Sequence, residues 1–483
     1  MSGADLKILH VNTHDTRGGA AQAAWRLHRA YAARGITSWM AVKRKGSDDP
    51  GVFEIPNEQN RPWPARVLRA IAGRMGTSSP LARATARTLR RVAEPARFRD
   101  IRRGVEDFHF PGSWKLFDLL PESPDLVHCH NLHGGYFDLR ALSMIAERAP
   151  VVLFLHDAWL LSGHCAYSFG CERWKTGCGE CPDLTIHPAV QADATDYNWR
   201  RKRDIFSKAS LHVATPSRWL MDRVEASMLA PAVRGARVIP LGIDLSVFHP
   251  GDTRRARMHL GVPRDARVVL LAADGIRANS RKDFATARAA VAEAAERLAG
   301  SGGELVLLAL GESSDPVRIG NATVRFVPFQ DDPSIVAEHY RAADLYLHTA
   351  REDNFPCTVL EALACGTPVV ATAVGGVPEQ VRSLTAVPGI AAVEEETATG
   401  MLVPPGDPDA LSAAIVRLLA DGPLRTRLAE NAAREARSRF DVERYADDFV
   451  AWYGEILRGE AAGWPWREGH ADGASPRSLP VGT

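Results

Sequence analysis

The stretch REDNFPCTVLEALACGTPVVATAVGG, residues 351–376, decides the fold that this sequence predicts. It follows an apolar run at 345–349 that is typical of a buried strand. A polar loop comes next, then a helix that Thr358 can cap and Gly366 can end, and then a β-branched run at 368–374. Strand, loop, helix and strand in this order indicate a doubly wound α/β sheet, in which ligands bind at the carboxyl ends of the strands.

The polar loop and the start of the helix offer groups for a hydroxyl-rich or anionic ligand. Backbone N–H groups and the positive end of the helix dipole lie at a helix N-terminus. Glu361 lies one turn into the helix, where a carboxylate can hold a pair of sugar hydroxyls. Taken alone, Glu361 is better explained as an incidental surface glutamate on a capped helix.

The whole stretch resembles the C-terminal signature of glycosyltransferase family 4, retaining enzymes that use nucleotide sugars. The strings GTPVVAT (366–372) and GGVPE (375–379) add to the resemblance. It implies the GT-B architecture, α/β with two Rossmann-like doubly wound domains facing a cleft. The family pattern has two acids eight positions apart, and Asp353 and Glu361 have that spacing. Glu361 falls where the family binds the nucleotide ribose. Asp353 replaces a usual glutamate, and Glu352 beside it is the alternative first acid.

The resemblance also assigns sugar-binding groups to the loop between the acids. Backbone N–H groups around Asn354, Phe355 and Pro356 are implied to hold the donor sugar, together with Asp353 or Glu352. The family's retention is explained by same-face attack, in which the leaving phosphate takes the acceptor proton. No dedicated nucleophile is therefore expected.

Length and composition set the broad class of the protein. A chain of 483 residues exceeds one ordinary core, so two or more domains are expected. Hydrophobic content of 45% and charged content of 24% fit a soluble globular protein, and a net charge of +1 neither favours nor excludes a polyanionic partner. The sequence shows no secretory signal and no apolar run long enough to span a bilayer, so we expect a cytoplasmic protein.

The strand and helix patterns divide the chain into regions. Residues 1–245 are expected to form a Rossmann-like acceptor domain, and residues 246–440 a Rossmann-like nucleotide-sugar domain. The resemblance implies that a helix at 441–458 returns to the first domain. Residues 459–483 are rich in Gly, Pro and Ser, which predicts a disordered tail.

Two glycines follow the expected first strand at 7–12. Gly18 and Gly19 precede a helical pattern at 20–34, and glycines in this place let a backbone approach a phosphate closely. A double glycine alone usually marks a turn. The family places this loop beside the donor diphosphate, so the resemblance implies donor contacts there, and Arg17 is a candidate for phosphate or acceptor.

His156 follows an apolar strand at 151–155, where the interdomain cleft is expected. The resemblance implies that His156 contacts the donor sugar near the reacting carbon, and Asp157 can orient its ring. A His–Asp pair satisfied within the loop is the alternative interpretation. His130 and His133 are further candidates for the acceptor site.

The basic loop at 274–282 precedes a helix of the second domain. The resemblance implies an Arg and a Lys here that neutralise the donor diphosphate, because the leaving group is charged and no ligand set for a catalytic metal is visible. Lys282 matches the Lys. The family spacing places the Arg at Ile276, so Arg277 is our first choice and Arg281 the second.

Four of the seven cysteines fall within seventeen positions: Cys165, Cys171, Cys178 and Cys181. Four clustered thiols in a cytosolic protein predict a structural zinc site, with His164 as a substitute ligand. Such a site staples a loop and does no chemistry. Reduced thiols or a redox pair are the alternatives.

The loop that carries these cysteines, 160–187, resembles that of colanic-acid-type exopolysaccharide glycosyltransferases. Two tryptophans belong to the same region. Trp159 and Trp174 suit either packing of the stapled loop or stacking on an acceptor sugar.

Residues 61–103 carry twelve arginines and only two acids, interleaved with apolar residues. This pattern predicts one or two basic amphipathic helices with breaks at Pro64, Pro80 and Pro95, in an insertion at 51–110. Such helices suit an anionic membrane surface. An insertion with a solvated basic face explains the pattern equally well. Nucleic-acid binding is the weakest interpretation, since no nucleic-acid-binding module accompanies the segment.

These features predict a retaining glycosyltransferase that moves a sugar from a nucleotide-sugar donor to a glycan or a polyprenyl-diphosphate-linked acceptor. The expected setting is exopolysaccharide or cell-surface polysaccharide synthesis, at the inner face of the membrane if the acceptor is a lipid. The alternatives are an inactive nucleotide-sugar-binding module and a glycosyltransferase of small metabolites. We expect no catalytic metal and no nucleic-acid partner.

Overall fold

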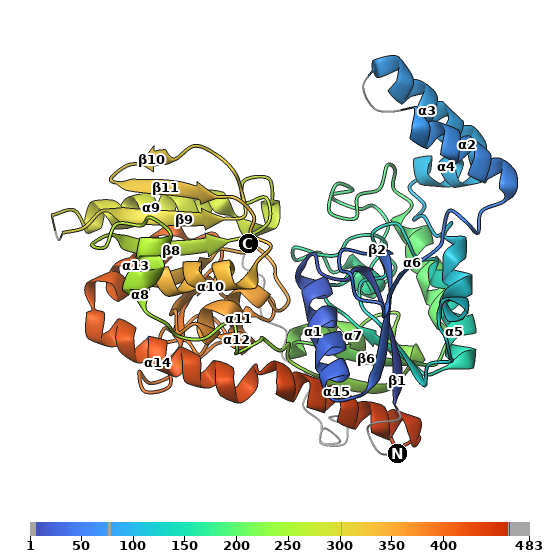
Figure 1. Cartoon of the computed structure of the whole chain (residues 1–483). Coiled ribbons are helices and arrows are strands. Elements are labelled where there is room, and N and C mark those ends of the chain that lie inside the picture. Colours follow the sequence, from blue (N-terminus) through green and yellow to red (C-terminus); the bar gives the residue numbers. More distant parts are fainter. Residues whose placement is uncertain (1–5, 76–78, 301, 462, 464–483) are drawn as a thin grey trace.

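A computed structural model of the chain describes residues 6–75, 79–300, 302–461 and 463. Two α/β domains lie side by side, and long C-terminal helices run beneath both of them (Figure 1). Each domain contains one seven-stranded sheet covered by helices. This is the GT-B arrangement of two Rossmann-like domains that the sequence predicts.

The first sheet has the order β3-β2-β1-β4-β5-β6-β7, and all neighbouring strands pair in parallel. Its central strands β4 and β5 are buried along their whole length, because helices cover both faces of a parallel sheet. The strands are β1 (Lys7–His14), β2 (Thr37–Arg44), β3 (Val52–Glu54), β4 (Leu126–Cys129), β5 (Val151–Phe154), β6 (Leu211–Thr215) and β7 (Val233–Val238). The helices are α1 (Gly19–Ala33), α2 (Trp63–Arg74), α3 (Pro80–Ala93), α4 (Pro95–Arg102), α5 (Leu142–Arg148), α6 (Thr195–Phe206) and α7 (Arg218–Glu225).

The second sheet has the order β10-β11-β9-β8-β12-β13-β14, and only the edge pair β10–β11 is antiparallel. The strands are β8 (Arg267–Ala272), β9 (Leu305–Leu310), β10 (Val317–Ile319), β11 (Ala322–Val327), β12 (Leu345–His348), β13 (Val369–Thr372) and β14 (Gly400–Val403). The helices are α8 (Thr253–His259), α9 (Phe284–Arg297), α10 (Pro333–Ala342), α11 (Cys357–Ala364), α12 (Val377–Gln380), α13 (Pro408–Ala420), α14 (Gly422–Arg439) and α15 (Val442–Leu457). The order of the strands reverses at β8 and β12, whose carboxyl ends face the first domain.

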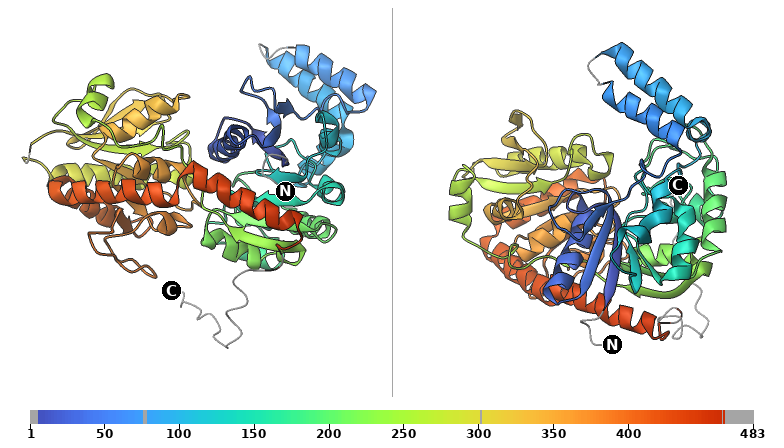
Figure 2. Two further views of the ribbon diagram at one scale, coloured as in Figure 1. Left: turned by 60° about the horizontal axis from the view of Figure 1, so that its bottom comes forward. Right: turned by 45° about the vertical axis from the view of Figure 1, so that its right-hand side comes forward.

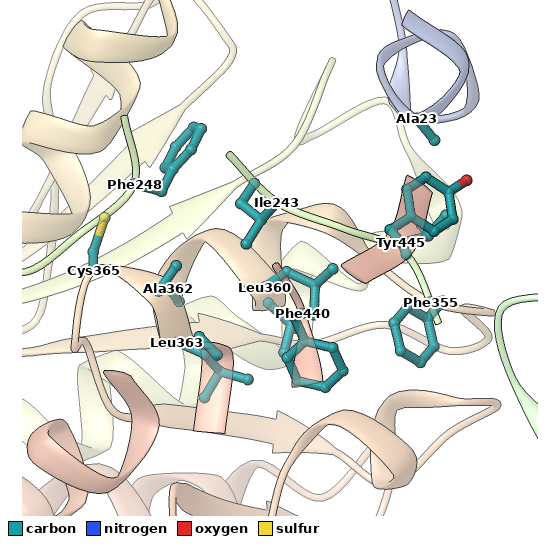
Figure 3. Close-up of a cluster of buried hydrophobic side chains, with 14 of the residues drawn as sticks. Ala23, Ile243, Phe248, Phe355, Leu360, Ala362, Leu363, Cys365, Phe440 and Tyr445 are labelled. Atoms are coloured by element: carbon teal, nitrogen blue, oxygen red, sulfur yellow. The ribbon is translucent and has the colours of Figure 1, made fainter. Parts of the chain in front are cut away.

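One buried apolar cluster continues from the second domain into the first. Figure 3 shows Phe355 and Phe440 beside Ile243 and Tyr445 in this cluster. The backbone ties the same region together, since Ile243 N donates to Phe440 O at 2.7 Å. The linker between the domains is therefore packed into the core.

The last helix, α15, crosses back and packs against α1 of the first domain (Figures 1 and 2). Arg34 donates to Asp447 Oδ1 at 2.9 Å, and the hydroxyl of Tyr453 lies 2.6 Å from His128 Nδ1. The helix thus anchors its buried aromatic face beneath the strands that carry the candidate site.

The basic segment differs from the prediction in two respects. It forms three helices, α2, α3 and α4, rather than one or two, and Pro64, Pro80 and Pro95 lie in their first turns. A proline is tolerated there because the first N–H groups of a helix have no intrahelical partner. The predicted insertion at 51–110 also begins too early, because β3 pairs with β2 in the sheet.

Thr358 does not cap α11, because the helix already begins at Cys357 after Pro356. The predicted tail at 459–483 lies outside the described residues, apart from 459–461 and 463.

Candidate active site

Two loops at the carboxyl ends of β8 and β12 meet at the centre of the site. Lys282, at the end of the 3-10 helix Ser280–Lys282, donates to Asp353 Oδ2 at 2.7 Å. His348 Nε2 lies 3.4 Å from the same oxygen. Thr349 Oγ1 donates to the carbonyl of Lys282 at 2.8 Å, which ties the two loops together. Because the two strands are parallel neighbours, their ends bring these residues to one edge of the sheet.

The charge states of Asp353 and His348 follow from their burial and from the contact between Asp353 and Lys282. Burial alone would raise the pKa of Asp353, but Lys282 and His348 hold that pKa well below its usual value. Burial lowers the pKa of His348 to about 4, so its imidazole is neutral at pH 7. Asp353 is therefore an ionised partner of Lys282. The ammonium group has three donors, so it can bind a phosphate oxygen without leaving the carboxylate.

Glu352, the alternative first acid, serves a different contact. Its carboxylate accepts from the backbone N–H groups of Ser168 at 3.0 Å and Phe169 at 2.7 Å, and the residue is only 5% exposed. These partners belong to the cysteine-bearing loop of the first domain. Of the two adjacent acids, Asp353 is the one that lies beside Lys282.

Arg277, our first choice for the diphosphate arginine, is not brought to Lys282. Its guanidinium forms an ion pair with Glu312, which follows β9, and lies 4.9 Å from the ring centroid of Phe326. The side chain is half exposed. Glu312 therefore holds this arginine beside the end of β9, and Arg277 does not line the interdomain cavity described below.

Arg281, the second choice, faces the cleft instead. Its guanidinium stacks 4.1 Å from the ring centroid of Tyr167 in the first domain. Burial alone would lower the pKa of Arg281, but Tyr167, Asp353 and Asp157 nearby raise it. The structure thus places Arg281, rather than Arg277, among the acids of the site.

Glu361 lies on α11 where the two domains meet. Tyr340 donates to its Oε2 at 2.9 Å, and Arg26 Nη2 on α1 lies 3.7 Å from its Oε1. Arg26 also donates to the carbonyl of Gly242 at 3.1 Å, so it spans the first domain, the linker and α11. Burial raises the pKa of Glu361, while Arg26 and Tyr340 act against this rise.

The loop between the acids uses its side chains to join the domains. Asn354 Oδ1 accepts from Ser217 Oγ at 2.6 Å, and Asn354 Nδ2 donates to the carbonyl of His156 at 3.1 Å. Phe355 is buried, and Pro356 has no N–H and immediately precedes α11. Any contact from this loop to a sugar therefore has to come from its backbone.

The double glycine after β13 lets that loop pack closely. A side chain on Gly375 would place its Cβ 1.8 Å from the carbonyl oxygen of Asp353, and one on Gly376 would come within 2.1 Å of the carbonyl of Asn354. Gly375 also has a φ of +57°. These glycines hold the acidic loop against the sheet.

Gly18 lies between β1 and α1 and Gly19 is the first residue of α1, on the opposite side of the cleft. Gly18 has a φ of +98°, and a Cβ at either glycine would meet nothing within 4 Å. This open space is what close approach of a phosphate to the backbone requires. Arg17 beside them lies 5.9 Å from the ring centroid of Phe329 in the second domain.

His156 and Asp157 do not form the predicted pair. His156 Nε2 lies 3.1 Å from His130 Nδ1, whereas Asp157 Oδ2 accepts from His133 Nε2 at 2.8 Å. Both residues lie in the bend after β5, and each has its own partner. The interpretation that Asp157 orients His156 is therefore wrong, and His130 takes that place.

A cavity of about 1030 Å³ opens between the domains at this edge. On the first domain it is lined by His133, Asp157 and residues 167–169, and on the second by Arg281 and Arg351. The cavity combines aromatic, acidic and basic walls, which suits a polar ligand with hydroxyl or phosphate groups.

Comparison with known proteins decides the family. The chain matches the family model described as Glycosyltransferase Family 4 over residues 17–247, and the model described as Glycosyl transferases group 1 over residues 317–435. It is 34% identical over 350 residues to D-inositol 3-phosphate glycosyltransferase 1 of Catenulispora acidiphila, covering 70% of this chain and 74% of that protein. The chain belongs to glycosyltransferase family 4.

Other relatives and solved structures agree with this assignment. The enzyme is 27% identical over 380 residues to WcaC of Escherichia coli, a protein described by inference as a colanic acid biosynthesis glycosyl transferase. The match covers 76% of this chain and 83% of WcaC. Sucrose-phosphate synthase of Thermosynechococcus elongatus has the same fold, with a TM-score of 0.62 and 20% identity over 94% of this chain and 100% of that one. HepE of Anabaena in complex with UDP-glucose also has this fold, with a TM-score of 0.56 and 18% identity. The match covers 93% of this chain and 100% of HepE.

In this family 4 glycosyltransferase the four loop cysteines are free thiols. Burial raises the pKa of Cys165 to about 11 and that of Cys178 to about 12. His164 Nε2 lies 3.3 Å from Cys181 Sγ, as a substitute ligand would require. Neighbouring thiols of the loop add to the rise of these two pKa values, and no disulfide joins any of the four.

The thiols do not form a closed ligand set as they stand. Over the part of the chain that the structure describes, the one group of three potential ligand atoms within 4.8 Å of one another is His10, His128 and His130. The zinc site therefore stays a prediction.

Trp159 and Trp174 are both buried in the glycosyltransferase, which favours packing over stacking on an acceptor. Trp159 Nε1 donates to Glu106 Oε1 at 2.6 Å, and Lys202 Nζ lies 3.9 Å from a ring centroid of the same indole. The carbonyl of Trp174 accepts from Trp199 Nε1 at 2.7 Å. Both indoles anchor the loop to the first domain.

Arg26 and Glu379 also join the two domains, although no local pattern singles them out. Arg26 looks like an ordinary surface arginine on a helix, and only the topology brings it to Glu361. Glu379 belongs to the GGVPE string, but its role lies in the first domain, where its carboxylate accepts from the N–H groups of Arg218 at 2.8 Å and Trp219 at 2.9 Å. An acid from one domain thereby caps helix α7 of the other.

Proposed function

We propose that this enzyme is a retaining glycosyltransferase that moves a sugar from a nucleotide-sugar donor to a glycan or lipid-linked acceptor, in exopolysaccharide or cell-surface polysaccharide synthesis. The observation that carries the proposal is the 2.7 Å contact between Lys282 and Asp353 at the strand ends, with Glu361 eight positions further on. The UDP-glucose complex of HepE, which shares the fold, supports a nucleotide-sugar donor. The similarity to WcaC supports the polysaccharide setting.

On the donor side, each charge has a role in the proposed reaction. Lys282 and Arg281 stabilise the negative charge that develops on the departing diphosphate, which is the largest demand of this reaction. Glu361 holds the ribose hydroxyls, and Gly18 and Gly19 admit the phosphates. Asp353 fixes Lys282 and accepts from the sugar hydroxyls through its other oxygen.

On the acceptor side, two cavities support a substrate with a polar and an apolar part. A second cavity of about 420 Å³ shares His133 and His187 with the interdomain cavity and extends toward α4. Its walls include Ile101, Val105 and Phe108. This arrangement favours an acceptor whose lipid portion lies beneath the basic helices while its sugar or phosphate reaches the cleft.

The helices α2 and α3 support docking on an anionic membrane surface. They project from the first domain as a hairpin (Figures 1 and 2). Trp63 and Leu81 near its two ends are 75% and 78% exposed, and Val67 and Ile71 continue the stripe of Trp63 at four-residue spacing. Exposed apolar side chains among arginines suit insertion into a negatively charged interface. Within the described residues, no helix has the length and apolar content needed to cross a bilayer.

A small soluble acceptor is the second candidate. The relatives named D-inositol 3-phosphate glycosyltransferases favour it, and the cavity walls carry Arg281 and Arg351, which suit a phosphorylated polyol. The relative of this name from Geodermatophilus obscurus is 37% identical, but over only 47% of its length. The basic hairpin has no role in this alternative.

We also propose that Cys165, Cys171, Cys178 and Cys181 hold a structural zinc ion. Free thiols on one loop and the contact of His164 with Cys181 support this ligand set. The ion would draw the four sulfur atoms together and fix the loop that Glu352 holds against the second domain. It would take no part in the reaction.

A donor screen tests the proposed function. Thermal unfolding is followed with UDP-, GDP- and ADP-sugars, and we expect one nucleotide class to raise the unfolding temperature through mass action. Sugar transfer is then measured with that donor and with polyprenyl-diphosphate-linked or inositol phosphate acceptors. No stabilisation by any donor and no transfer would reject the proposal.

A further inference from the structure

Three histidines form a continuous chain beneath the site. His10 on β1, His130 after β4 and His156 after β5 come from strands that are neighbours in the sheet. His10 Nδ1 lies 3.1 Å from His130 Nε2, and His130 Nδ1 lies 3.1 Å from His156 Nε2. Both ring nitrogens of His130 are therefore hydrogen-bonded to the other two histidines.

The imidazoles of this chain are neutral at pH 7. Burial lowers the pKa of His10 to about 3 and that of His156 to about 4, and it holds the pKa of His130 well below its usual value. A neutral imidazole carries one N–H donor and one bare acceptor nitrogen. His130 therefore donates to one neighbour and accepts from the other, and both hydrogen bonds must run in the same direction.

The far end of the chain decides which direction that is. His10 Nε2 is buried and has no hydrogen-bond partner among the described residues. If the bonds ran from His156 toward His10, this nitrogen would carry a buried, unpaired N–H group, which folded proteins avoid more strictly than an unused acceptor. The favoured direction runs from His10 through His130 to His156, whose Nε2 then accepts.

We propose that His10 and His130 are positioning residues that hold His156 in the tautomer with its proton on Nδ1, so that His156 offers an N–H donor to the donor sugar. This inference rests on the proposed function, which places the sugar at His156. Nδ1 of His156 has no hydrogen-bond partner among the described residues, and the residue is partly exposed. A ligand oxygen that accepts a hydrogen bond fits this nitrogen, and a group that only donates does not.

A metal ion on the same histidines would exclude this arrangement. His10, His128 and His130 have ligand atoms within 4.8 Å of one another. Coordination by His130 would need the lone pair that now accepts from His10, or would displace the proton that it shares with His156. The two assignments are therefore exclusive, and metal content belongs in the test.

The test reads the tautomer directly in the intact protein. The protein is labelled with 15N-histidine, and the ring nitrogens of His156 are identified at pH 7 as the signals missing in His156→Asn. We expect a protonated Nδ1 and a bare Nε2. In His130→Phe, His156 loses its partner, so we expect the Nε2-protonated form to appear and kcat/KM for the donor to fall roughly tenfold, the usual size of an effect from a group behind the contacting residue.

His128→Phe is the matched control. His128 lies on β4, two positions before His130, and is also buried, but its Nδ1 is hydrogen-bonded to Tyr453 rather than to His10, His130 or His156. We expect its His156 tautomer and kcat/KM to stay near those of the wild type. A protonated Nε2 on wild-type His156, an unchanged tautomer in His130→Phe, or one tightly bound metal ion per chain lost in His128→Phe would each overturn the proposal.

The wild-type spectrum alone shows which tautomer His156 adopts, even if a variant fails to fold. It also separates this inference from the proposed function. An Nδ1-protonated His156 in a protein that transfers no sugar would reject the function and keep the tautomer assignment, while the opposite tautomer in an active enzyme would reject the inference alone.

Discussion

Lys282 and Asp353 lie 2.7 Å apart at the carboxyl edge of the second sheet, although 71 positions separate them in the sequence. The contact favours Asp353 over Glu352 as the acid of the proposed donor site, because the carboxylate of Glu352 is already occupied by the N–H groups of Ser168 and Phe169. Loss of the Asp353 carboxylate should therefore reduce activity, whereas loss of the Glu352 carboxylate should reduce stability.

We expect Asp353→Asn to lower kcat by about tenfold or more with an almost unchanged unfolding temperature, because it removes the charge beside Lys282. Glu352→Gln should lower the free energy of unfolding by about 1.5–3 kcal/mol, the usual contribution of a charged hydrogen bond. Steady-state kinetics and thermal unfolding of the two variants check this. The opposite pattern, inactive Glu352→Gln with full stability and active Asp353→Asn, would contradict the assignment.

Buried histidines make the free energy of unfolding of the enzyme depend on pH. The folded-state pKa values of His10, His156 and His348 are lowered to about 3, 4 and 4, below the value near 6.5 of an unfolded histidine. The unfolded chain therefore binds more protons as the pH falls from 6.5 to 4. We expect the free energy of unfolding to fall in this window by about 1.4 kcal/mol per pH unit for each such histidine.

Urea unfolding between pH 7 and pH 4.5 measures this slope. His10→Phe should reduce the slope by about one proton, whereas Lys115→Gln, a change at an exposed surface pair, should leave it unchanged. A flat profile in the wild type would show that these imidazoles are not held neutral.

Zinc should be found at one ion per chain in freshly purified protein. Because the unfolded chain has no preformed site, binding free energy is folding free energy, and a chelator should lower the unfolding temperature. Cys178→Ser should lose the ion, whereas Cys365→Ser, a change of a buried thiol outside the loop, should retain it. Absence of zinc by elemental analysis, or a disulfide between any two of the four thiols, would reject the site.

The hairpin of α2 and α3 should bind anionic liposomes at low salt and release them as salt rises. An arginine near such a surface contributes about 1 kcal/mol at most, so several must be changed together. We expect Arg66, Arg87 and Arg90 changed jointly to Gln to abolish co-sedimentation with phosphatidylserine-containing liposomes.

The matched control changes two exposed arginines of the second domain, Arg254 and Arg255, to Gln. This variant should sediment like the wild type. If the wild-type protein stays in the supernatant at low salt, docking is wrong, and the soluble acceptor becomes the favoured candidate.

The sequence predicted the fold well where local patterns are strong. The helix expected at 441–458 is Val442–Leu457 and the strand expected at 151–155 is Val151–Phe154, within one residue at each end, because each combines a clear apolar pattern with sharp end signals. The signature at 351–376 also placed the acidic loop correctly between a strand and a helix. The three helices of 63–102 were harder to predict, because prolines both end and begin helices.

The candidate site could be predicted only in part, because its contacts join distant segments. Lys282 and Asp353 were selected from separate motifs, but nothing local indicated that Arg277 would be held by Glu312 and leave Arg281 in the cleft. The chain of histidines was equally hidden. His10 reads as one residue of an apolar strand, and its contact with His130 depends on the order of the strands in the sheet.

Donor turnover in Lys282→Ala tests the central claim most directly. With the donor that the screen identifies, we expect Lys282→Ala and Arg281→Ala each to lose on the order of 100-fold in kcat, since removal of one preorganised charge contact costs about 3 kcal/mol of transition-state stabilisation. Arg277→Ala, the matched control outside the cleft, should keep most of its activity. Near-normal turnover of Lys282→Ala at saturating donor, with unchanged donor affinity, would contradict the account.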